Sequence, residues 1–309
     1  MLQLNKTTDG EGEKVALVIF NPNAGLRAKK GVKKLVEDKL RSLGYKADLF
    51  YLDPDFEKNI EGYNFKLVKL VVAVGGDGTV KVAGRTIIEN GLDVSLALVP
   101  FGSANVIATT FGISMNPKKS IKLLGNKINT AIDVGLINKK HYFLVGLSIG
   151  YVSRVVLNTT ESIKNRFGIL GYLMSLLFAK IRIRKFKFEI KTQDKIFWIK
   201  GNSLVIGNTF NYFGLSPRKY INPQDGILNL YVFTNKTFFD MIRAFFYIIL
   251  FQKPPKFVFT LDNEYFRVSL SRKTKACQID GDFVDLGKDI EVEVLKQALK
   301  IIIPKNIQQ

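Results

Sequence analysis

The stretch VVAVGGDGTV, from Val71 to Val80, is an apolar run that ends in three glycines around one aspartate. A short, continuous apolar run is typical of a parallel strand that is buried on both faces. Glycines directly after such a strand let the backbone approach a ligand closely, and their N–H groups can point at phosphate oxygens. A tight turn with Asp77 as a helix cap is the alternative interpretation of this stretch taken alone.

The first part of the chain alternates strand-like and helical segments. Short runs rich in Val, Leu and Ala predict strands at residues 15–20, 47–52, 70–74 and 95–99. Apolar residues at helical spacing predict helices at residues 28–44 and 80–91. This alternation predicts an α/β fold with a wound parallel sheet.

The pattern changes after about Asp133. Short strand-like runs separated by Gly, Pro, Asn and Asp predict a β-sandwich as a second domain, with helical inserts at about residues 163–180 and 237–251. We therefore divide the chain into an α/β domain (1–134) and a β-sandwich domain (135–295), and expect segment 296–309 to return to the first domain.

The chain is strongly basic. Its 309 residues include 46 Lys and Arg against 27 Asp and Glu, a formal charge of +19. Such a surface attracts nucleic acid, an anionic membrane or phosphorylated small molecules. Segment 162–188 contains no acid and mixes basic with apolar residues, which favours a membrane surface; an amphipathic helix over a sheet gives the same pattern. Nucleic acid is the least favoured partner, because no recognition motif accompanies the charge.

Single residues exclude several kinds of site. Cys277 is the only cysteine and His141 the only histidine, which excludes an intramolecular disulfide and a Cys/His zinc cluster. The polar, acidic start does not have the pattern of a secretory signal. The longest apolar stretches are shorter than the roughly 20 residues that span a bilayer. We expect a cytoplasmic protein that associates peripherally with a membrane.

Two more loops of small residues accompany GGDGT. They are NPNAG at residues 21–25 and PFGSAN at residues 100–105, each directly after a predicted strand. In a parallel sheet such loops share the carboxyl edge, where these folds bind ligands. Thr79 and Ser103 add hydroxyl donors for phosphate, and Asp77 suits a Mg²⁺ that bridges it to a nucleotide. A dinucleotide fingerprint is excluded because Lys81 stands at its last glycine position, and the G-x-x-x-x-G-K-[ST] motif is absent.

With these loops in place, the sequence resembles the diacylglycerol kinase catalytic family, which includes YegS-like lipid kinases and sphingosine kinases. The motifs in family order are NPNAG, GGDGTV, PFGSANVIATTFGI, DVGLIN, GNTFNYFG, DGILNLYVF and DGD (280–282), which span about Val15 to Ile303. The resemblance implies a nucleotide-binding α/β domain, a lipid-binding β-sandwich and a C-terminal segment that returns to the first domain. It also implies transfer of the γ-phosphoryl group of ATP to a lipid hydroxyl with Mg²⁺, a diacylglycerol-like acceptor being favoured.

The resemblance also implies roles for individual residues. Those expected at the nucleotide and its metal are Asn21, Gly75, Gly76, Asp77, Gly78, Thr79 and Ser103. Asp225 would hold Mg²⁺ with the backbone carbonyls of Asn222 and Ile227, unless it only forms an Asp-Gly hairpin turn. Asp282 would be the catalytic base where the family has Glu, and Asp77 would also act in catalysis. For membrane docking we expect Lys164, Arg166, Lys180, Arg182, Arg184 and Lys185.

Several positions depart from the family pattern and keep alternatives open. Asp282 is one methylene shorter than Glu, and DGD is also an ordinary hairpin sequence. Val106 and Val152 stand where many members have an acid. One alternative is therefore a catalytically impaired regulator that binds lipid or nucleotide, and another is a kinase for a soluble substrate, similar to NAD kinase. A homodimer is compatible with the sequence.

Overall fold

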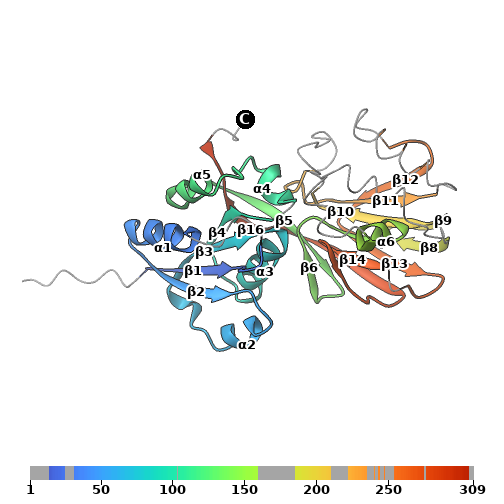
Figure 1. Ribbon diagram of the computed structural model, residues 1–309. Coiled ribbons are helices and arrows are strands. Elements are labelled where there is room, and N and C mark those ends of the chain that lie inside the picture. Colours follow the sequence, from blue (N-terminus) through green and yellow to red (C-terminus); the bar gives the residue numbers. More distant parts are fainter. Residues whose placement is uncertain are drawn as a thin grey trace, which may run out of the picture.

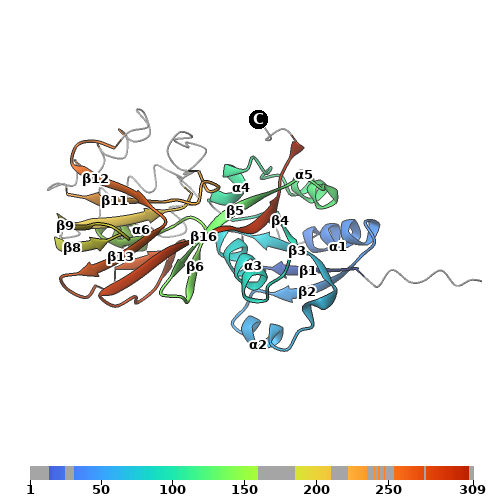
Figure 2. The ribbon, with the colours of Figure 1, turned by 180° about the vertical axis from the view of Figure 1, so that it is seen from behind.

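The computed structural model describes residues 14–24, 31–102, 104–158, 185–209, 222–234, 240, 243, 247, 254–274 and 276–305. Figures 1 and 2 show helices and strands layered together in one part of the molecule, and mostly strands in the other. We call these the α/β part and the β part. The predicted fold class is confirmed: a parallel sheet comes first in the chain and a separate antiparallel sheet follows.

Four parallel strands form the centre of the α/β part. Their spatial order is β2 (Tyr45–Tyr51), β1 (Lys14–Phe20), β3 (Val68–Gly75) and β4 (Ser95–Pro100). They lie where the apolar runs predict strands. Because β1, β3 and β4 are buried along almost their whole length, their side chains are apolar on both faces.

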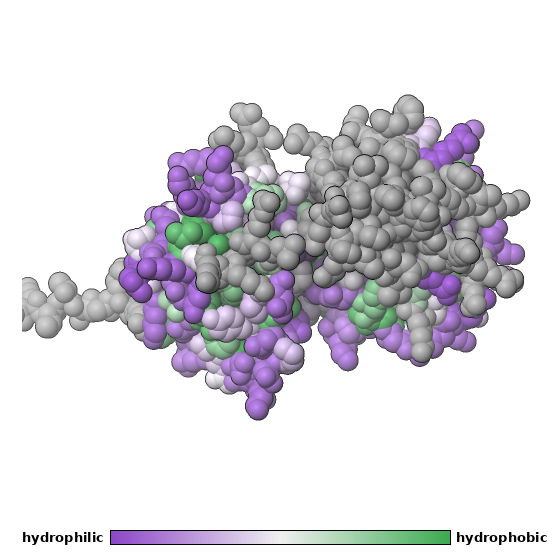
Figure 3. Space-filling model, in the orientation of Figure 1, coloured by the Kyte–Doolittle hydropathy of each residue, from purple (hydrophilic) through white to green (hydrophobic). Residues whose placement is uncertain are grey.

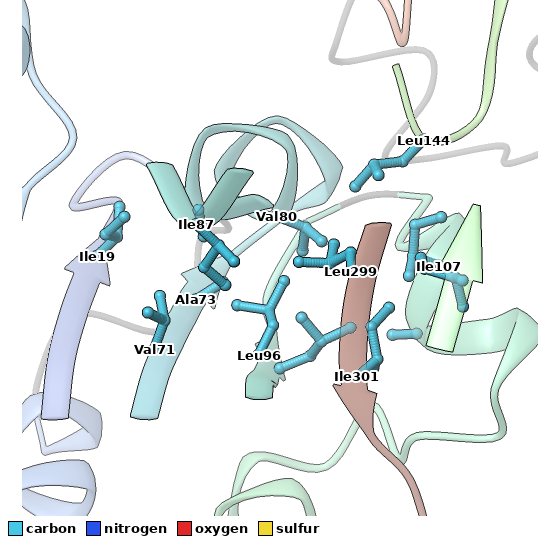
Figure 4. Packing of buried hydrophobic residues seen from close by; sticks show 14 of the residues in the cluster. Ile19, Val71, Ala73, Val80, Ile87, Leu96, Ile107, Leu144, Leu299 and Ile301 are labelled. Atoms are coloured by element: carbon cyan, nitrogen blue, oxygen red, sulfur yellow. The ribbon is translucent and has the colours of Figure 1, made fainter. Parts of the chain in front are cut away.

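Helices cover both faces of this sheet. On one face lie α1 (Val32–Ser42), α5 (Pro117–Lys122) and the short helix η2 (Leu123–Gly125). On the other lie α2 (Phe56–Ile60), α3 (Asp77–Glu89) and α4 (Val106–Thr110), while η1 (Phe65–Leu67) leads into β3. Figure 4 shows Val80 and Ile87 of α3 packed with Leu96, Leu299 and other buried residues of this second face. Helix α3 begins at Asp77 rather than at residue 80, so Asp-Gly-Thr form its first turn.

Two antiparallel layers form the β part. One is a six-stranded sheet among the described residues, in the order β12 (Val258–Asn263), β11 (Leu228–Phe233), β10 (Ser203–Gly207), β7 (Gly146–Gly150), β14 (Cys277–Ile279) and β15 (Asp282–Phe283). The facing layer holds β13 (Tyr265–Leu270), β8 (Phe186–Lys191) and β9 (Ile196–Gly201). Phe188, Phe266 and Leu204 belong to the core between them. Helix α6 (Tyr151–Asn158) was not predicted.

The long strand β16 (Asp289–Ile302) joins the two parts. Its first half pairs with β13, and its end pairs in parallel with β4 through Lys300 and Ile301. Strand β5 (Asn129–Ile137) runs antiparallel beside it and also pairs with β6 (His141–Phe143). One sheet therefore continues from the α/β part into the β part. The domain boundaries at 134 and 295 stay a prediction.

The predicted insert at 163–180 lies outside the described residues. Of the insert at 237–251, residues 240, 243 and 247 are described, and they are helical. Within the described parts of the chain, no helix has the length and apolar composition needed to cross a membrane.

Candidate functional site

Three loops meet at the carboxyl edge of the parallel strands. The N–H of Asn21, after β1, donates to the carbonyl of Val74 at 3.0 Å, and the N–H of Phe101, after β4, donates to the carbonyl of Gly75 at 2.8 Å. The loop after β3 therefore lies between the other two. The segments NPNAG, GGDGT and PFGSAN are neighbours at this edge as far as they are described.

Close packing requires glycine at three positions of these loops. A Cβ on Gly102 would lie 2.5 Å from the Cα of Gly76, so the two backbones touch where a side chain would keep them apart. A Cβ on Gly75 would overlap the Oγ1 of Thr79. Gly78 is different, because a Cβ there would meet no atom within 4 Å. Close packing therefore explains Gly75, Gly76 and Gly102, whereas Gly78 borders open space.

Asn105 shapes the third loop and was not predicted as a site residue. Its Oδ1 accepts the N–H of Gly102 at 2.8 Å, and its Nδ2 donates to the carbonyl of Gly102 at 2.6 Å. Its φ of 47° is left-handed, a conformation that asparagine adopts more readily than most residues. An Asn directly before a helix was the available sequence signal. The predicted Ser103 lies outside the described residues, between these two anchors.

Asp77 ties the second loop to the third. It is the first residue of α3, yet its Oδ1 accepts the N–H of Ile107 in the first turn of α4 at 3.3 Å. Burial raises the pKa of Asp77, and the backbone N–H groups of Val106, Ile107 and Asn105 oppose that rise. Asp77 therefore caps a helix, but that helix is α4 rather than the one it begins.

Thr79 leaves a polar atom without a partner beneath the loop. The residue is 1% exposed, and its Oγ1 has no hydrogen-bond partner among the described residues. Buried hydroxyl groups are normally hydrogen-bonded, so an orphan of this kind needs a water or a ligand atom. It lies in the first turn of α3, at the helix end that attracts anions.

Lys81 connects helix α3, which follows the GGDGT loop, to the DGD motif. Its ammonium group, one helical turn after Asp77, pairs with the Oδ2 of Asp282 on β15. The two residues are 201 positions apart in the chain. The Lys81 side chain is 18% exposed and that of Asp282 is 65% exposed, so the carboxylate remains open to solvent. Lys81 entered the sequence analysis only as a residue that breaks a dinucleotide fingerprint.

Asp280, the first aspartate of the DGD motif, has a structural role. Asp280 accepts the N–H groups of Leu144, Val145 and Gly146 at 2.8, 3.0 and 2.8 Å. Burial raises the pKa of Asp280 to about 6, while these N–H groups and Lys81 act in the opposite direction. Asp280 therefore fastens the β14–β15 hairpin to the segment before β7, which fixes where Asp282 emerges.

Asp225 lies in a turn with several oxygen atoms around it. Its Oδ1 accepts the N–H of Ile227 at 3.0 Å, and its own N–H donates to the carbonyl of Asn222 at 3.4 Å. Burial raises the pKa of Asp225, and the negative charges of Asp133 and Asp262 add to this rise. The Asp225 carboxylate, the nearby Asn222 carbonyl and the negative charge of Asp133 and Asp262 are features that suit Mg²⁺.

The described residues contain no group of three His, Cys, Asp or Glu side chains that could hold a metal ion. A Mg²⁺ at Asp225 would therefore take its other ligands from water or from backbone carbonyls, and the sequence resemblance implies those of Asn222 and Ile227.

Asp133, the first residue of the DVGLIN motif, is a structural centre that was not predicted as a site residue. Fully buried, it accepts the N–H of Gly226 at 2.7 Å on Oδ2 and that of Gln297 at 2.8 Å on Oδ1. Its own N–H donates to the carbonyl of Pro223 at 2.7 Å. This side chain therefore fastens the Asp225 turn to β5 and β16.

Of the six residues predicted for membrane docking, one is described. Five of them, Lys164, Arg166, Lys180, Arg182 and Arg184, lie outside the described residues. Lys185 is exposed, and its carbonyl accepts an N–H from Arg272 at 2.8 Å.

The fold and the site define a class of protein in which glycine-rich loops of a parallel α/β sheet face a carboxylate from a β part. Residues 15–137 match the family model of the diacylglycerol kinase catalytic domain. This part of the chain is therefore similar to a diacylglycerol kinase catalytic domain, and the resemblance seen in the sequence is confirmed.

Two curated relatives are similar to most of the chain. The chain is 28% identical over 244 residues to "Probable lipid kinase YegS-like" of Klebsiella pneumoniae (strain 342), which covers 77% of this chain and 79% of the relative. It is 29% identical over 248 residues to "Probable lipid kinase YegS" of Salmonella arizonae, with the same coverage of 77% and 79%.

Structural similarity extends over nearly the whole chain. A crystal structure of a diacylglycerol kinase from Bacillus anthracis has a TM-score of 0.75 at 20% identity and covers 95% of this chain and 98% of its own. A second structure from the same organism has a TM-score of 0.78 at 21% identity, with coverage of 99% and 100%. At this identity the similarity establishes the shared fold.

Proposed function

We propose that the chain is a lipid kinase that transfers the γ-phosphoryl group of ATP to a hydroxyl group of a lipid. The observation that carries the proposal is the pair of Lys81 and Asp282, which brings a solvent-exposed carboxylate of the β part to the first turns of α3, beside the glycine-rich loops. The match of residues 15–137 to the diacylglycerol kinase catalytic domain and relatives named as probable lipid kinases support the same reaction.

The three loops are suited to the phosphates of the nucleotide. We expect backbone N–H groups around Gly75, Gly76 and Gly78, together with the N-terminus of α3, to face phosphate oxygens. Gly78 borders open space, where a nucleotide can approach the backbone. The unpaired hydroxyl of Thr79 offers a further donor, and Asn21 and Ser103 complete the proposed set.

Mg²⁺ bound with the nucleotide would neutralise charge that develops on its phosphate oxygens during transfer. Because Asp77 is already engaged with the N–H of Ile107, we propose that it acts mainly as a positioning residue for the second and third loops. We propose that Asp225 and the backbone carbonyls of Asn222 and Ile227 would bind a separate Mg²⁺.

Asp282 is the proposed general base. Its carboxylate would accept the proton of the lipid hydroxyl while that oxygen forms its bond to the γ-phosphorus and the bond to the bridging oxygen of ADP breaks. The ammonium group of Lys81 holds the carboxylate at the first turns of α3, beside the glycine-rich loops. Phe283, 38% exposed beside it, offers apolar surface for an acyl chain.

Radiolabelled ATP tests the proposal. The full chain is incubated with Mg²⁺ and a panel of diacylglycerol, monoacylglycerol, phosphatidylglycerol and sphingoid bases, and lipid products are separated from nucleotide. We expect label in one lipid class, its loss on chelation of Mg²⁺ and its return when Mg²⁺ is restored. Nucleotide binding without label in any lipid would contradict the proposed activity.

That contrary result would favour the regulator of the same fold. Val106 starts α4 as a buried residue, and Val152 lies in α6, so neither position supplies the acid found in many family members. A carboxylate network between two metals cannot form through these positions. The lipid panel decides between the two functions.

A further inference from the structure

The outer face of β9 carries apolar side chains where a strand of this kind usually carries polar ones. Along β9, Phe197 and Ile199 pack against the core of the β part. The alternating residues Ile196 and Trp198 point the other way and are 47% and 72% exposed. Antiparallel sheets normally place polar residues on their solvated face, so two neighbouring large apolar side chains indicate a surface that meets something else.

Lysines surround these two side chains. In the pairing of β8 with β9, Lys187 lies opposite Lys200, and Glu189 lies opposite Trp198. Directly paired residues project from the same face of a sheet, so these side chains share the face of Trp198. Glu189 is paired with Lys191 at 2.8 Å. Among the described residues, Lys187 and Lys200 have no acidic partner, which leaves the face with an excess of positive charge.

We call Lys187, Ile196, Trp198 and Lys200 the β9 patch. Strand β9 is the last strand in its sheet, and Figure 1 shows it with β8 at the end of the β part away from α1 and β2. In Figure 3, hydrophilic residues border this end of the molecule. The basic, apolar segment 162–188 ends within β8 and includes Lys187, so the patch adjoins the part of the sequence most suited to a membrane.

Two features decide what the patch meets. Tryptophan combines a large apolar ring with one N–H donor, which suits the boundary between lipid headgroups and acyl chains. Lysines beside it are attracted to anionic headgroups. A second copy of the chain fits less well, because lysines on an edge strand oppose pairing with an identical edge.

We propose that the β9 patch docks on an anionic lipid surface, with Trp198 at the level of the headgroups and Lys187 and Lys200 against lipid phosphates. The choice of a lipid surface rests on the proposed function. Docking itself requires no turnover, so it can be tested without ATP.

Trp198 is the only tryptophan in the chain, so its fluorescence reports on this patch alone. The full chain is mixed with phosphatidylcholine vesicles, with and without phosphatidylglycerol. We expect a blue shift of the emission on the anionic vesicles, quenching by lipids with brominated acyl chains, and reversal by high salt. Co-sedimentation with anionic vesicles while the emission stays unshifted and unquenched would overturn the proposal, because binding would then occur elsewhere.

Variants give a second, independent readout by co-sedimentation. We expect Trp198→Ala to weaken binding roughly ten-fold, and each of Lys187→Gln and Lys200→Gln to weaken it about five-fold. The matched control is Tyr51→Ala, which removes an aromatic side chain that is 41% exposed in the α/β part and should leave binding unchanged. Equal binding by Trp198→Ala and the native chain, with both folded by circular dichroism, would contradict the proposal.

The failure of docking can be told apart from failure of the kinase activity. Phosphorylation of a detergent-dispersed lipid by Trp198→Ala at the native rate would keep the proposed function while isolating the role of the patch. If the emission shift occurs but no lipid is phosphorylated in any form, the docking proposal is supported and the proposed kinase activity is contradicted. Self-association that Trp198→Ala abolishes, without vesicle binding, would make the patch a contact between copies and overturn the proposal.

Discussion

Residues of the same type have different roles in this site. In the DGD motif, Asp280 is enclosed by three backbone N–H groups, whereas Asp282 stays open to solvent beside Lys81. Among the glycines, Gly102 is packed against Gly76, while Gly78 faces open space. Chemistry at the site therefore depends on positions that look equivalent in the sequence.

The glycines provide a matched test of loop packing. Gly102→Ala would place a Cβ 2.5 Å from the Cα of Gly76, so we expect the free energy of unfolding to fall by about 1–3 kcal/mol. Gly78→Ala meets no atom within 4 Å and should leave stability the same or raise it by about 0.5 kcal/mol. Denaturant unfolding measures both. Equal effects of the two substitutions would contradict the close contact between Gly102 and Gly76.

Residue types and their order were enough to predict the loops, because glycine next to a buried strand has a local meaning. Asn105 was missed because its role comes from its left-handed conformation and two bonds to Gly102. Lys81 was missed as a site residue because its partner lies 201 positions away. Its pairing depends on how the two parts of the molecule meet, which no local pattern encodes.

At the scale of elements, α3 and β16 organise the site. The strands of the parallel sheet follow from continuous apolar runs, which only a doubly covered sheet can bury. The first turn of α3 was not predicted, because glycine and aspartate are weak helix formers and their helical state depends on contacts to α4. The predicted domain division at 295 falls within β16, because half of this strand pairs in each part of the molecule.

Asp133 tests this junction of elements. It accepts two backbone N–H groups, from Gly226 and Gln297, on its two carboxylate oxygens. Asp133→Asn would turn an NH₂ group toward one of these donors, so we expect a loss of about 1–3 kcal/mol in the free energy of unfolding. The control Asp194→Asn, in the exposed turn before β9, should change it by less than about 0.5 kcal/mol. Equal values for both variants would contradict the role of Asp133.

At the scale of the whole molecule, one continuous sheet carries both parts and holds the site at their junction. Strand β16 extends from the β part to β4 of the α/β part. The ion pair between Lys81 on α3 and Asp282 on β15 is a second link between the two parts. Because the loops and the proposed base come from different parts, the reaction that we propose needs both. The net charge of +19 would attract the whole molecule to an anionic membrane. The β9 patch is the surface that we propose makes the contact.

The most direct measurement compares turnover and nucleotide affinity in Asp282→Asn. Our account predicts that lipid phosphorylation falls by roughly a hundred-fold or more, because the amide cannot accept the hydroxyl proton, while the affinity for ATP stays within about two-fold of the native value. Asp285→Asn, an exposed carboxylate after the same hairpin, should keep native turnover. Native turnover in Asp282→Asn would contradict the account, because the base would then have to be another group.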